Sequence, residues 1–523
     1  MIKQINSTRD ALNICGDRGE KVIHQWVQQL LHQALATQLI EREDEIYARN
    51  QILSFLHLTE FKESNLAGLN DCDIPELLEK IVDYACAQSI IEDLFDEREI
   101  FSSKLMNCLI ARPSTVNQLF YEKYLQNPAY ATHYFYELSK NSNYIQMKRI
   151  RNNIEYKVAT EYGELDITVN LSKPEKDPRS IELERMADKS DYPNCLLCIE
   201  NEGYAGRIGH PARSNHRMIR VELLGESWYL QFSPYVYYEE HCIVLSEKHA
   251  DMKISPTTFL RLLTFVEKFP HYFIGSNADL PIVGGSILSH EHYQGGNYEF
   301  MMARADSDWT FEIARFPKVR CSIVKWPMSV IRLRSEQIST LVEAGSHIFM
   351  KWQNYSDEPL GIIARTDEIP HNTITPIARK NGDIFELDLV LRNNRTNEEH
   401  PLGIFHPHRD VHHIKRENIG LIEVMGLAVL PARLKEELEE VEKYILGEAH
   451  RVEDYHLAWA KELKIRYEAN ANETTIESFV RGEVGKKFLK GLEDAAVFKR
   501  NEEGKEGFQR FIVACNSSNA VEV

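Results

Sequence analysis

The chain has 523 residues, a formal net charge of −18 at pH 7 and 43% hydrophobic residues. A chain of this length can form two or three domains with substantial cores, and its hydrophobic content argues against disorder. The sequence contains no apolar run of about 18 residues, so no membrane-spanning segment is expected. The acidic balance disfavours a nucleic-acid binder, because such proteins usually carry a basic surface.

The first part of the chain, from residue 10 to about residue 140, is expected to be mainly helical. Apolar residues recur at helical spacing at Val22, Trp26, Leu30 and Leu31. A similar periodicity covers Ile74 to Leu94, with Pro75 near its start. These apolar stripes predict a packed core rather than ligand contacts. The charged, proline-bearing run from Lys173 to Arg179 is typical of a connector.

Nine cysteines are scattered along the chain, and only Cys195 and Cys198 show a regular spacing. An odd number of cysteines without the regular spacing of a disulfide framework predicts a reducing compartment rather than disulfide bonds. The beginning, Met1 to Thr8, does not resemble a signal peptide, so a cytoplasmic location is expected.

The C-x-x-C pair formed by Cys195 and Cys198 can supply two thiolates to one tetrahedral metal ion, and two imidazoles would complete a Cys₂His₂ site. His249 and His290 are candidates for the imidazoles. Thiolate and imidazole ligands favour zinc. A redox pair and two ordinary buried cysteines are the alternatives. The redox alternative is the weaker one, since no thioredoxin-like strand and helix surround the pair.

After residue 190 the pattern changes from helices to strands. Residues 228–232 and 242–245 are predicted to be strands, and a helix is predicted from about Ser255 to Phe269. Ser255 is expected to be the N-cap of this helix, with Pro256 at its first position.

The segment His290-Glu-His292-Tyr-Gln294 lies between Gly284-Gly285-Ser286 and Gly295-Gly296. Read as a strand, it directs His290, His292 and Gln294 to one face, about 6.6 Å apart for each two-residue step. A neutral imidazole is a competent nucleophile near pH 7, and glycines let a phosphate approach the backbone closely. The segment therefore suggests phosphate chemistry. A polar edge strand with chance histidines is the alternative.

Anionic ligands require local positive charge in such an acidic chain. Arginine is suited to bidentate phosphate contacts, and Arg207, Arg213 and Arg217 are candidates. The alternative for each is a solvated surface charge.

The C-terminal half contains a second H-x-H, formed by His406 and His408. A strand-like run, Gly420 to Glu423, follows it. From Pro431 onward an amphipathic helix is predicted, with Leu434, Leu438, Val441 and Ile445 as one stripe.

Taken together, Cys195-x-x-Cys198, Ser246-Glu-Lys-His249 and His290-x-His292-x-Gln294 resemble the galactose-1-phosphate uridylyltransferases of the histidine-triad superfamily. Residues 45–50, 170–178 and 415–423 resemble the second, bacterial class of that family. The resemblance spans nearly the whole chain. In the first class a proline separates the two histidines and a glycine often precedes the glutamine, whereas this chain has Glu291 and Tyr293.

The resemblance implies an α+β fold made of two tandem histidine-triad-like units with antiparallel sheets, preceded by a mainly helical region. The expected boundaries are residues 1–180 for the helical region, 181–330 for the first unit with the catalytic and zinc residues, and 331–523 for the second unit and C-terminal helices.

The resemblance also implies a double displacement, in which UMP passes from UDP-glucose to galactose 1-phosphate through a uridylyl-histidine, in the Leloir pathway of galactose metabolism. His292 would be the nucleophile, and Gln294 would hydrogen-bond the phosphoryl oxygens. Structural zinc would be bound by Cys195, Cys198, His249 and His290. Substrate contacts are expected from Phe232, Tyr235, Asn277, Ser286 and Glu423. A homodimer is implied, and a second metal near His406 and His408 is a weaker expectation.

Two other functions remain open at this point. One is a dinucleoside polyphosphate phosphorylase or hydrolase that uses the same histidine chemistry, and would place AMP rather than UMP on His292. The other is a zinc-stabilised interaction module without catalysis. That alternative leaves His292 and Gln294 without a purpose.

Overall fold

The computed structural model describes residues 17–65, 72–172, 182, 184, 186, 190–285, 287–469 and 474–517. The chain forms two compact units. The first consists of Met1–Arg151, Pro174–Arg220 and Gln231–Tyr235, and the second of Asn152–Lys173, Val221–Leu230 and Val236–Val523. The predicted connector from Lys173 to Arg179 lies outside the described residues.

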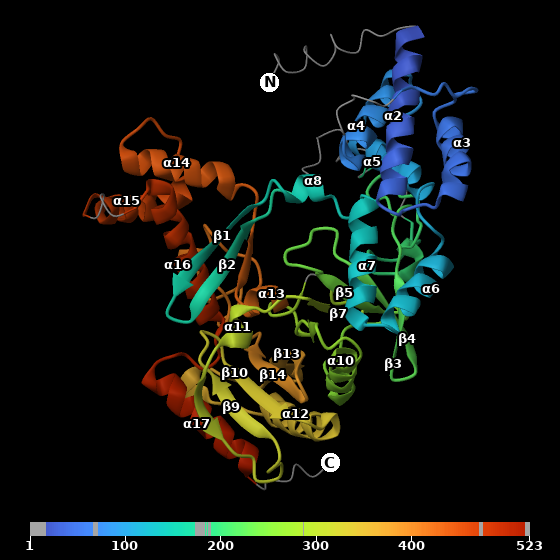
Figure 1. The fold of residues 1–523 in the computed structure, drawn as a ribbon. Helices are drawn as coiled ribbons and strands as arrows, with labels where there is room; N and C mark the ends of the chain where they lie inside the picture. The colour runs from blue at the N-terminus through green and yellow to red at the C-terminus, as the bar shows by residue number, and fades with distance from the viewer. Residues whose placement is uncertain are drawn as a thin grey trace. The chain divides into compact units, whose positions relative to one another are not determined.

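The first unit is mainly helical, as the apolar periodicity predicted (Figure 1). Its α-helices are α2 (Asp17–Ala36), α3 (Glu45–Phe55), α4 (Ile74–Ala87), α5 (Phe95–Asn107), α6 (Pro113–Tyr124), α7 (Pro128–Asn141) and α8 (Met147–Ile150), and its 3₁₀ turns are η1 (Arg42–Asp44) and η2 (Ile199–Asn201).

Helix α4 is shorter than predicted, because it ends at Ala87 rather than near Leu94. Its start follows the expected signals: the Asp73 carboxylate accepts the Glu76 N–H at 3.0 Å, and Pro75 occupies the first turn. Ser89 has a φ of 57°, in the left-handed region, which an α-helix cannot continue. The helical pattern of apolar residues therefore extends beyond Ala87, where the helix itself ends.

The second unit contains two sheets. A small sheet has the order β1-β2-β15, in which β1 (Ile154–Thr160) is antiparallel and β15 (Leu427–Leu430) parallel to β2 (Gly163–Val169). The large sheet has ten strands in the order β3-β4-β5-β7-β6-β13-β14-β10-β9-β8. These strands are β3 (Ile219–Leu223), β4 (Glu226–Phe232), β5 (Cys242–Ser246), β6 (Phe273–Gly275), β7 (His292–Gly296), β8 (Ser307–Phe311), β9 (Arg320–Val324), β10 (Val330–Ser335), β13 (Asn372–Asn381) and β14 (Ile384–Asn393). Strands β11 (Arg365–Thr366) and β12 (Ile369–Pro370) form a separate hairpin.

The large sheet repeats one strand order. Its first half runs β4-β5-β7-β6, with α10 (Pro256–Lys268) between β5 and β6 in the chain. Its second half runs β9-β10-β14-β13, with α12 (Ile338–Gln353) between β10 and β13. The halves join where β6 pairs antiparallel with β13. Helices α10 and α12 pack against each other and against β13. The α+β class is confirmed, with the same strand–strand–helix–strand–strand order present twice.

Several predicted elements of this unit are confirmed. Ser255 caps α10 in a capping box with Thr258, and Pro256 is its first residue. Strands β4 and β5 cover the two predicted strand segments. The predicted stripe is the buried side of α14 (Leu434–Leu446). The remaining elements are α11 (Met301–Arg304), α13 (Leu421–Val424), α15 (Asp454–Ala469), α16 (Ile476–Ala495), α17 (Glu502–Asn516), η3 (Glu358–Leu360) and η4 (Arg409–Val411).

The strand predicted at Gly420 to Glu423 is wrong, because these residues begin the short helix α13. A short apolar run does not distinguish a strand from one helical turn. The helical turn is stabilised by the Glu423 carboxylate, which accepts the Gly420 N–H at 3.2 Å. The strand in this region, β15, begins only at Leu427.

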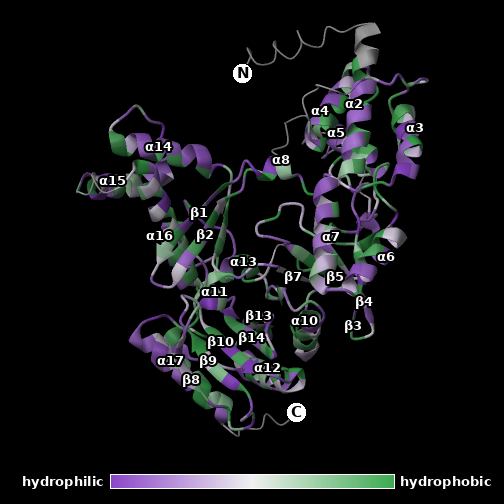
Figure 2. Ribbon diagram, viewed as in Figure 1, coloured by the Kyte–Doolittle hydropathy of each residue, from purple (hydrophilic) through white to green (hydrophobic). Residues whose placement is uncertain are grey.

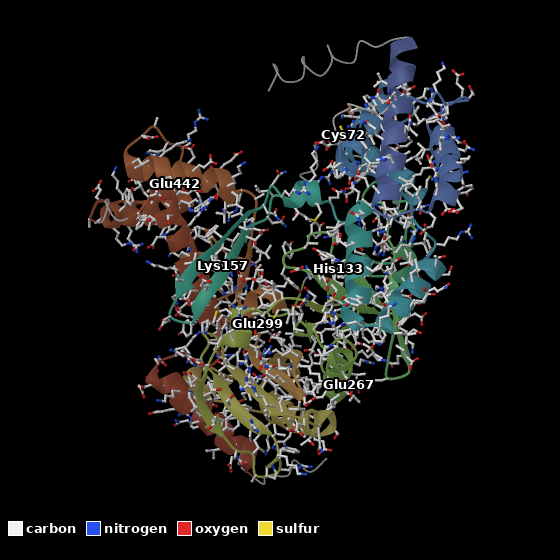
Figure 3. The ribbon with its side chains drawn as sticks, viewed as in Figure 1. Cys72, His133, Lys157, Glu267, Glu299 and Glu442 are labelled. Carbon is white, nitrogen blue, oxygen red and sulfur yellow. The ribbon has the colours of Figure 1, made fainter. Side chains whose placement is uncertain are left out.

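The core of the second unit is formed by buried residues of both sheets and of helices α14 to α16, including Leu165, Trp326, Val390, Leu438 and Phe488. Figure 2 shows hydrophobic and hydrophilic residues along the labelled helices, as expected for helices that bury one side. Charged side chains such as Lys157 and Glu267 are exposed (Figure 3). Among the described residues, no helix is long and apolar enough to cross a membrane.

Candidate active site

Strand β7 lies between β5 and β6 and presents the two catalytic candidates. His292 is opposite Leu245 of β5, and Gln294 is opposite Ile243 of β5 and Gly275 of β6. The strand was expected to start at His290 but starts at His292. The His290 side chain explains the difference, because its Nε2 lies 2.8 Å from the Ser246 carbonyl oxygen. The Glu291 N–H donates to the Ala250 carbonyl oxygen at 2.7 Å rather than to a residue of β5.

The His292 ring is 6% exposed, and a backbone carbonyl holds it in place. Its Nδ1 lies 2.8 Å from the carbonyl oxygen of His290. A carbonyl oxygen only accepts hydrogen bonds, so Nδ1 carries the proton and Nε2 keeps its lone pair. No hydrogen bond to Nε2 is found among the described residues. A backbone carbonyl oxygen therefore fixes the tautomer of the His292 ring.

Burial is the main reason that the pKa of His292 is lowered to about 4, and repulsion from His290 acts in the same direction. The hydrogen bond to the His290 carbonyl acts in the opposite direction. The imidazole is therefore neutral at pH 7. A neutral ring with a free Nε2 has the form that a nucleophile needs.

The Gln294 side chain is oriented by His241, a residue to which the sequence assigned no role. His241 Nε2 lies 3.3 Å from Gln294 Oε1. Burial lowers the pKa of His241 to about 4, so its ring is neutral and can donate one N–H to that oxygen. This contact assigns the carbonyl end of the amide, and leaves the NH₂ group to donate elsewhere. His241 immediately precedes β5, so its proximity to Gln294 depends on a strand register that is not visible in the sequence.

Two positions in this region require glycine because other atoms lie very close. A Cβ on Gly295 would lie 2.5 Å from the carbonyl oxygen of Phe273 on β6. A Cβ on Gly285 would lie 2.8 Å from the Asn277 Nδ2. The neighbouring candidate, Ser286, lies outside the described residues.

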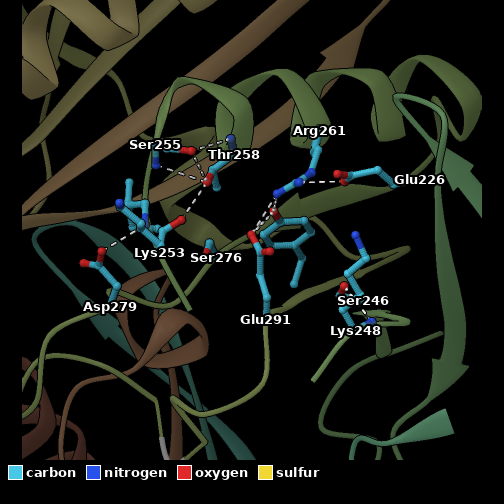
Figure 4. A network of polar contacts seen from close by, with 12 residues as sticks. Glu226, Ser246, Lys248, Lys253, Ser255, Thr258, Arg261, Ser276, Asp279 and Glu291 are labelled. Atoms are coloured by element: carbon cyan, nitrogen blue, oxygen red, sulfur yellow. Dashed lines mark hydrogen bonds and ion pairs between the residues drawn. The ribbon is translucent and has the colours of Figure 1, made fainter. Parts of the chain in front are cut away.

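Glu291 and Tyr293, where the chain departs from the first-class pattern, belong to one polar network. Figure 4 labels Glu291 in this network together with Arg261 and Glu226. Arg261 of α10 donates to Glu291 at 2.9 Å and to Glu226 at 2.6 Å. The Tyr293 hydroxyl donates to Glu291 at 3.0 Å, and its ring stacks on Trp228 with centroids 4.9 Å apart. This network attaches the strand that carries His292 to α10 and β4.

The candidate metal ligands form two pairs. In the first unit, the sulfur atoms of Cys195 and Cys198 are 3.5 Å apart, and the Leu197 N–H donates to Cys195 Sγ at 3.3 Å. In the second unit, the rings of His249 and His290 have centroids 4.9 Å apart. These four residues are the group of cysteines and histidines that could hold a metal ion within the described part of the chain.

The thiol pair fits a tetrahedral zinc ion. Two sulfurs at about 2.3 Å from one zinc lie roughly 3.8 Å apart, close to the observed separation. Asn201 holds the loop in this shape by donating to the carbonyl oxygens of Cys195 and Cys198, at 2.8 Å each. In the second unit His290 Nε2 lies 2.8 Å from the Ser246 carbonyl oxygen, and a histidine that binds zinc usually makes such a hydrogen bond with its other ring nitrogen.

Two family models match the chain. The model for the N-terminal domain of galactose-1-phosphate uridyl transferase matches residues 38–251, and the model for the C-terminal domain matches residues 265–461. The chain belongs to the galactose-1-phosphate uridylyltransferase family.

Similar proteins named galactose-1-phosphate uridylyltransferase occur in several bacteria. That of Clostridium perfringens (strain 13 / Type A) is 52% identical over 496 residues, which cover 94% of this chain and 99% of that protein. That of Halalkalibacterium halodurans is 52% identical over 500 residues, which cover 94% and 98%. Yeast Ap4A phosphorylase Apa2 is a solved structure with a TM-score of 0.31 and 13% identity, over 63% of this chain and 90% of that one. This likeness is too slight to bear on function.

The three arginines of the first unit that were predicted to bind phosphate have different surroundings. Arg217 is buried and donates to the protein's own acceptors, including Ala111 O and Asn107 Oδ1 at 2.9 Å each. Arg207 donates to Ser190 O, and the Arg213 guanidinium lies 5.2 Å from the Tyr144 ring centroid.

The two aromatic candidates of the same unit differ in exposure. Phe232 is fully buried against Phe135 and Tyr136, with ring centroids 5.2 and 4.9 Å away. Tyr235 is 37% exposed.

Asn277 and Glu423 meet at the start of α13. Asn277 Oδ1 accepts the Leu421 N–H at 2.9 Å, and Glu423 accepts the Gly420 N–H. Lys415 pairs with Glu423 at 2.9 Å. The structure therefore brings together two residues that are 146 positions apart in the chain.

His406 and His408 lie in the loop after β14, not on a strand. His406 Nδ1 lies 3.1 Å from Pro407 O, and His408 Nε2 lies 3.0 Å from Ile404 O. Neither belongs to a group of three or more metal-ligand side chains among the residues that the structure describes. The second metal stays a prediction.

Proposed function

We propose that this chain transfers UMP from UDP-glucose to galactose 1-phosphate, giving UDP-galactose and glucose 1-phosphate. The observation that supports this most directly is the state of His292, whose Nδ1 is held by a carbonyl and whose Nε2 makes no hydrogen bond to the described residues. Gln294 lies two residues further along the same strand, so both side chains face the same side. Family membership supports the choice of nucleotide and sugar phosphates.

In the first half-reaction, the lone pair of His292 Nε2 attacks the α-phosphorus of UDP-glucose. An N–P bond forms, and the bond from phosphorus to the bridging oxygen breaks. The oxygen leaves with that electron pair as part of glucose 1-phosphate. The Nδ1 proton remains on His292, where the His290 carbonyl oxygen stabilises the positive charge that develops on the ring.

In the second half-reaction, a phosphate oxygen of galactose 1-phosphate attacks the same phosphorus. The N–P bond breaks, and its electron pair returns to Nε2. The leaving groups are already anionic phosphates, so neither step needs a proton donor. Catalysis then depends mainly on positioning and charge stabilisation. Gln294 donates its N–H groups to the phosphoryl oxygens as charge develops on them.

Zinc is proposed as the resident metal, with Cys195, Cys198, His249 and His290 as ligands. When bound, it supplies structural stabilisation rather than a reactive group. His290 also provides the carbonyl that orients His292, so fixing the His290 ring stabilises the nucleophile's position.

Further parts of the proposal concern substrate contacts and assembly. Arg207 and Arg213 are retained as phosphate contacts, because Arg217 uses its donors within the protein. Tyr235, Asn277, Ser286 and Glu423 are retained as nucleotide and sugar contacts, whereas Phe232 is withdrawn because it is buried against Phe135 and Tyr136. A cytoplasmic homodimer is proposed, and light scattering of the purified protein tests the dimer.

Incubation with UDP-glucose, in the absence of galactose 1-phosphate, is expected to leave one uridylyl group on His292. Intact-mass measurement followed by peptide mapping detects it. Diadenosine polyphosphate is the comparison donor, and we expect no adenylyl adduct from it. An adenylyl adduct alone would replace the proposal with the dinucleoside polyphosphate alternative. An absence of any adduct would contradict both.

Replacing His241 by phenylalanine is expected to lower kcat by roughly three- to tenfold, the effect of losing one ordinary hydrogen bond, with little change in KM. The ring shape is kept, but the donor that orients Gln294 is lost. His347→Phe is a matched control, since its Nε2 contacts only the Cys515 carbonyl oxygen in the described contacts. Steady-state kinetics provide the measurement, and an unchanged kcat would remove His241 as a positioning residue.

A further inference from the structure

One row of paired residues crosses four strands of the large sheet with an excess of positive charge. Arg320 of β9 lies directly opposite Arg334 of β10. Arg334 lies opposite Glu386 of β14, and Glu386 lies opposite Arg379 of β13. Paired residues in an antiparallel sheet have their side chains on the same face, and like charges in direct opposition destabilise the pair. This row holds three guanidinium groups and one carboxylate.

The carboxylates of Glu386 and Asp388 on β14 are already engaged with arginines. Glu386 accepts from Arg334 Nε at 2.6 Å and from Arg379 Nε at 2.7 Å. In the next row, Asp388 binds Arg332 at 2.7 and 2.9 Å and also binds Arg379. In the described part of the chain, Arg320 makes no ion pair or side-chain hydrogen bond, although it faces another arginine.

A hollow of about 240 Å³ opens beside these two arginines. Its lining consists of Lys318, Arg320, Arg334, Ser335, Glu336, Gln337 and Ile384. The lining therefore carries three cations and one carboxylate, Glu336, although Arg334 is also paired with Glu386. This is a local excess of positive charge in a chain whose net charge is −18. Gln337 immediately precedes α12, so the positive end of a 16-residue helix adds to the local field.

We infer that this hollow binds a small dianionic oxyanion, of the phosphate monoester class, between the guanidinium groups of Arg320 and Arg334. Guanidinium groups bind phosphate oxygens through paired N–H donors, and Lys318 adds a third charge. A bound dianion neutralises the repulsion between the two opposed arginines, because both guanidinium groups then donate to the same ligand. The acidic balance of the chain disfavours a nucleic acid as occupant. The residues lie on the second copy of the repeated strand order, so the site is separate from His292 and Gln294 on β7.

Inorganic sulfate is the probe, because it stays dianionic over the usable pH range. At constant ionic strength set with chloride, millimolar sulfate should raise the Tm of the wild-type protein in a saturable way. Arg320→Gln should weaken the apparent sulfate affinity by about tenfold or more, since a charge-assisted pair is lost. In chloride alone, the variant should unfold at the same Tm or a higher one, because the like-charged pair is removed.

Arg365→Gln is the matched control, since Arg365 is an exposed arginine on the separate β11–β12 hairpin. It should keep the wild-type response to sulfate, which accounts for any general salt effect and for sulfate bound elsewhere. Lys318→Gln is a second variant of the proposed site, and it should reduce the sulfate affinity by a smaller factor than Arg320→Gln does. An equal sulfate response in the wild type and in Arg320→Gln would overturn the proposal, as would the absence of any saturable response.

Discussion

His292→Gly is expected to reduce uridylyl transfer by on the order of 10⁴-fold or more, the range seen when a covalent nucleophile is removed. The side chain supplies the attacking Nε2, and no other nitrogen nucleophile lies on the same face of the short strand β7. Transfer is measured as UDP-galactose formed from UDP-glucose and galactose 1-phosphate. The uridylyl adduct should disappear together with the turnover.

The same variant should keep its metal content and most of its stability. His292 is not in the proposed ligand set, and the network that fixes β7 involves Glu291, Tyr293 and Arg261 instead. Elemental analysis and thermal unfolding are the controls. Near-normal turnover in this variant would show that another residue carries the nucleotide.

Cys195→Ser is expected to lower the zinc content and the free energy of unfolding, by several kcal/mol if the site is lost. A serine hydroxyl is a poorer zinc ligand than a thiolate. Its oxygen also lies closer to Cβ than the sulfur does, so it does not reach the position of the ligand atom. The pairing with Cys198 and the Leu197 N–H contact would both be lost. Metal is measured by elemental analysis of the purified variant, and stability by denaturant unfolding.

Cys72→Ser is the matched control, because Cys72 is a half-exposed cysteine outside the metal-ligand group (Figure 3). It should retain the wild-type zinc content. If Cys195→Ser also retained it, Cys195 would have to be removed from the ligand set.

Local patterns in the sequence were sufficient for elements whose cause is local. The N-cap at Ser255, the proline after it and the buried stripe of α14 were all predicted correctly, because they depend on neighbours within a few turns. Predictions failed where a single residue ended or replaced an element. Ser89 stops α4 through its left-handed backbone, and Glu423 favours a helical turn over a strand.

The family could be predicted from the amino-acid sequence, and so could the nucleophile candidate His292 and the ligand types of the proposed metal site, because these depend on residue identity and short spacing. Three contacts of the folded chain could not be predicted in this way: the carbonyl that sets the His292 tautomer, the His241 ring on Gln294, and Arg320 opposite Arg334. Contacts of this second kind follow from strand pairing and loop geometry, and the partners of a strand can lie anywhere in the chain. The contact of His292 with the His290 carbonyl is local in the sequence. For the other two contacts, a one-residue shift in strand pairing would turn a side chain such as Gln294 or Arg334 to the opposite face, so residue types alone cannot reveal them.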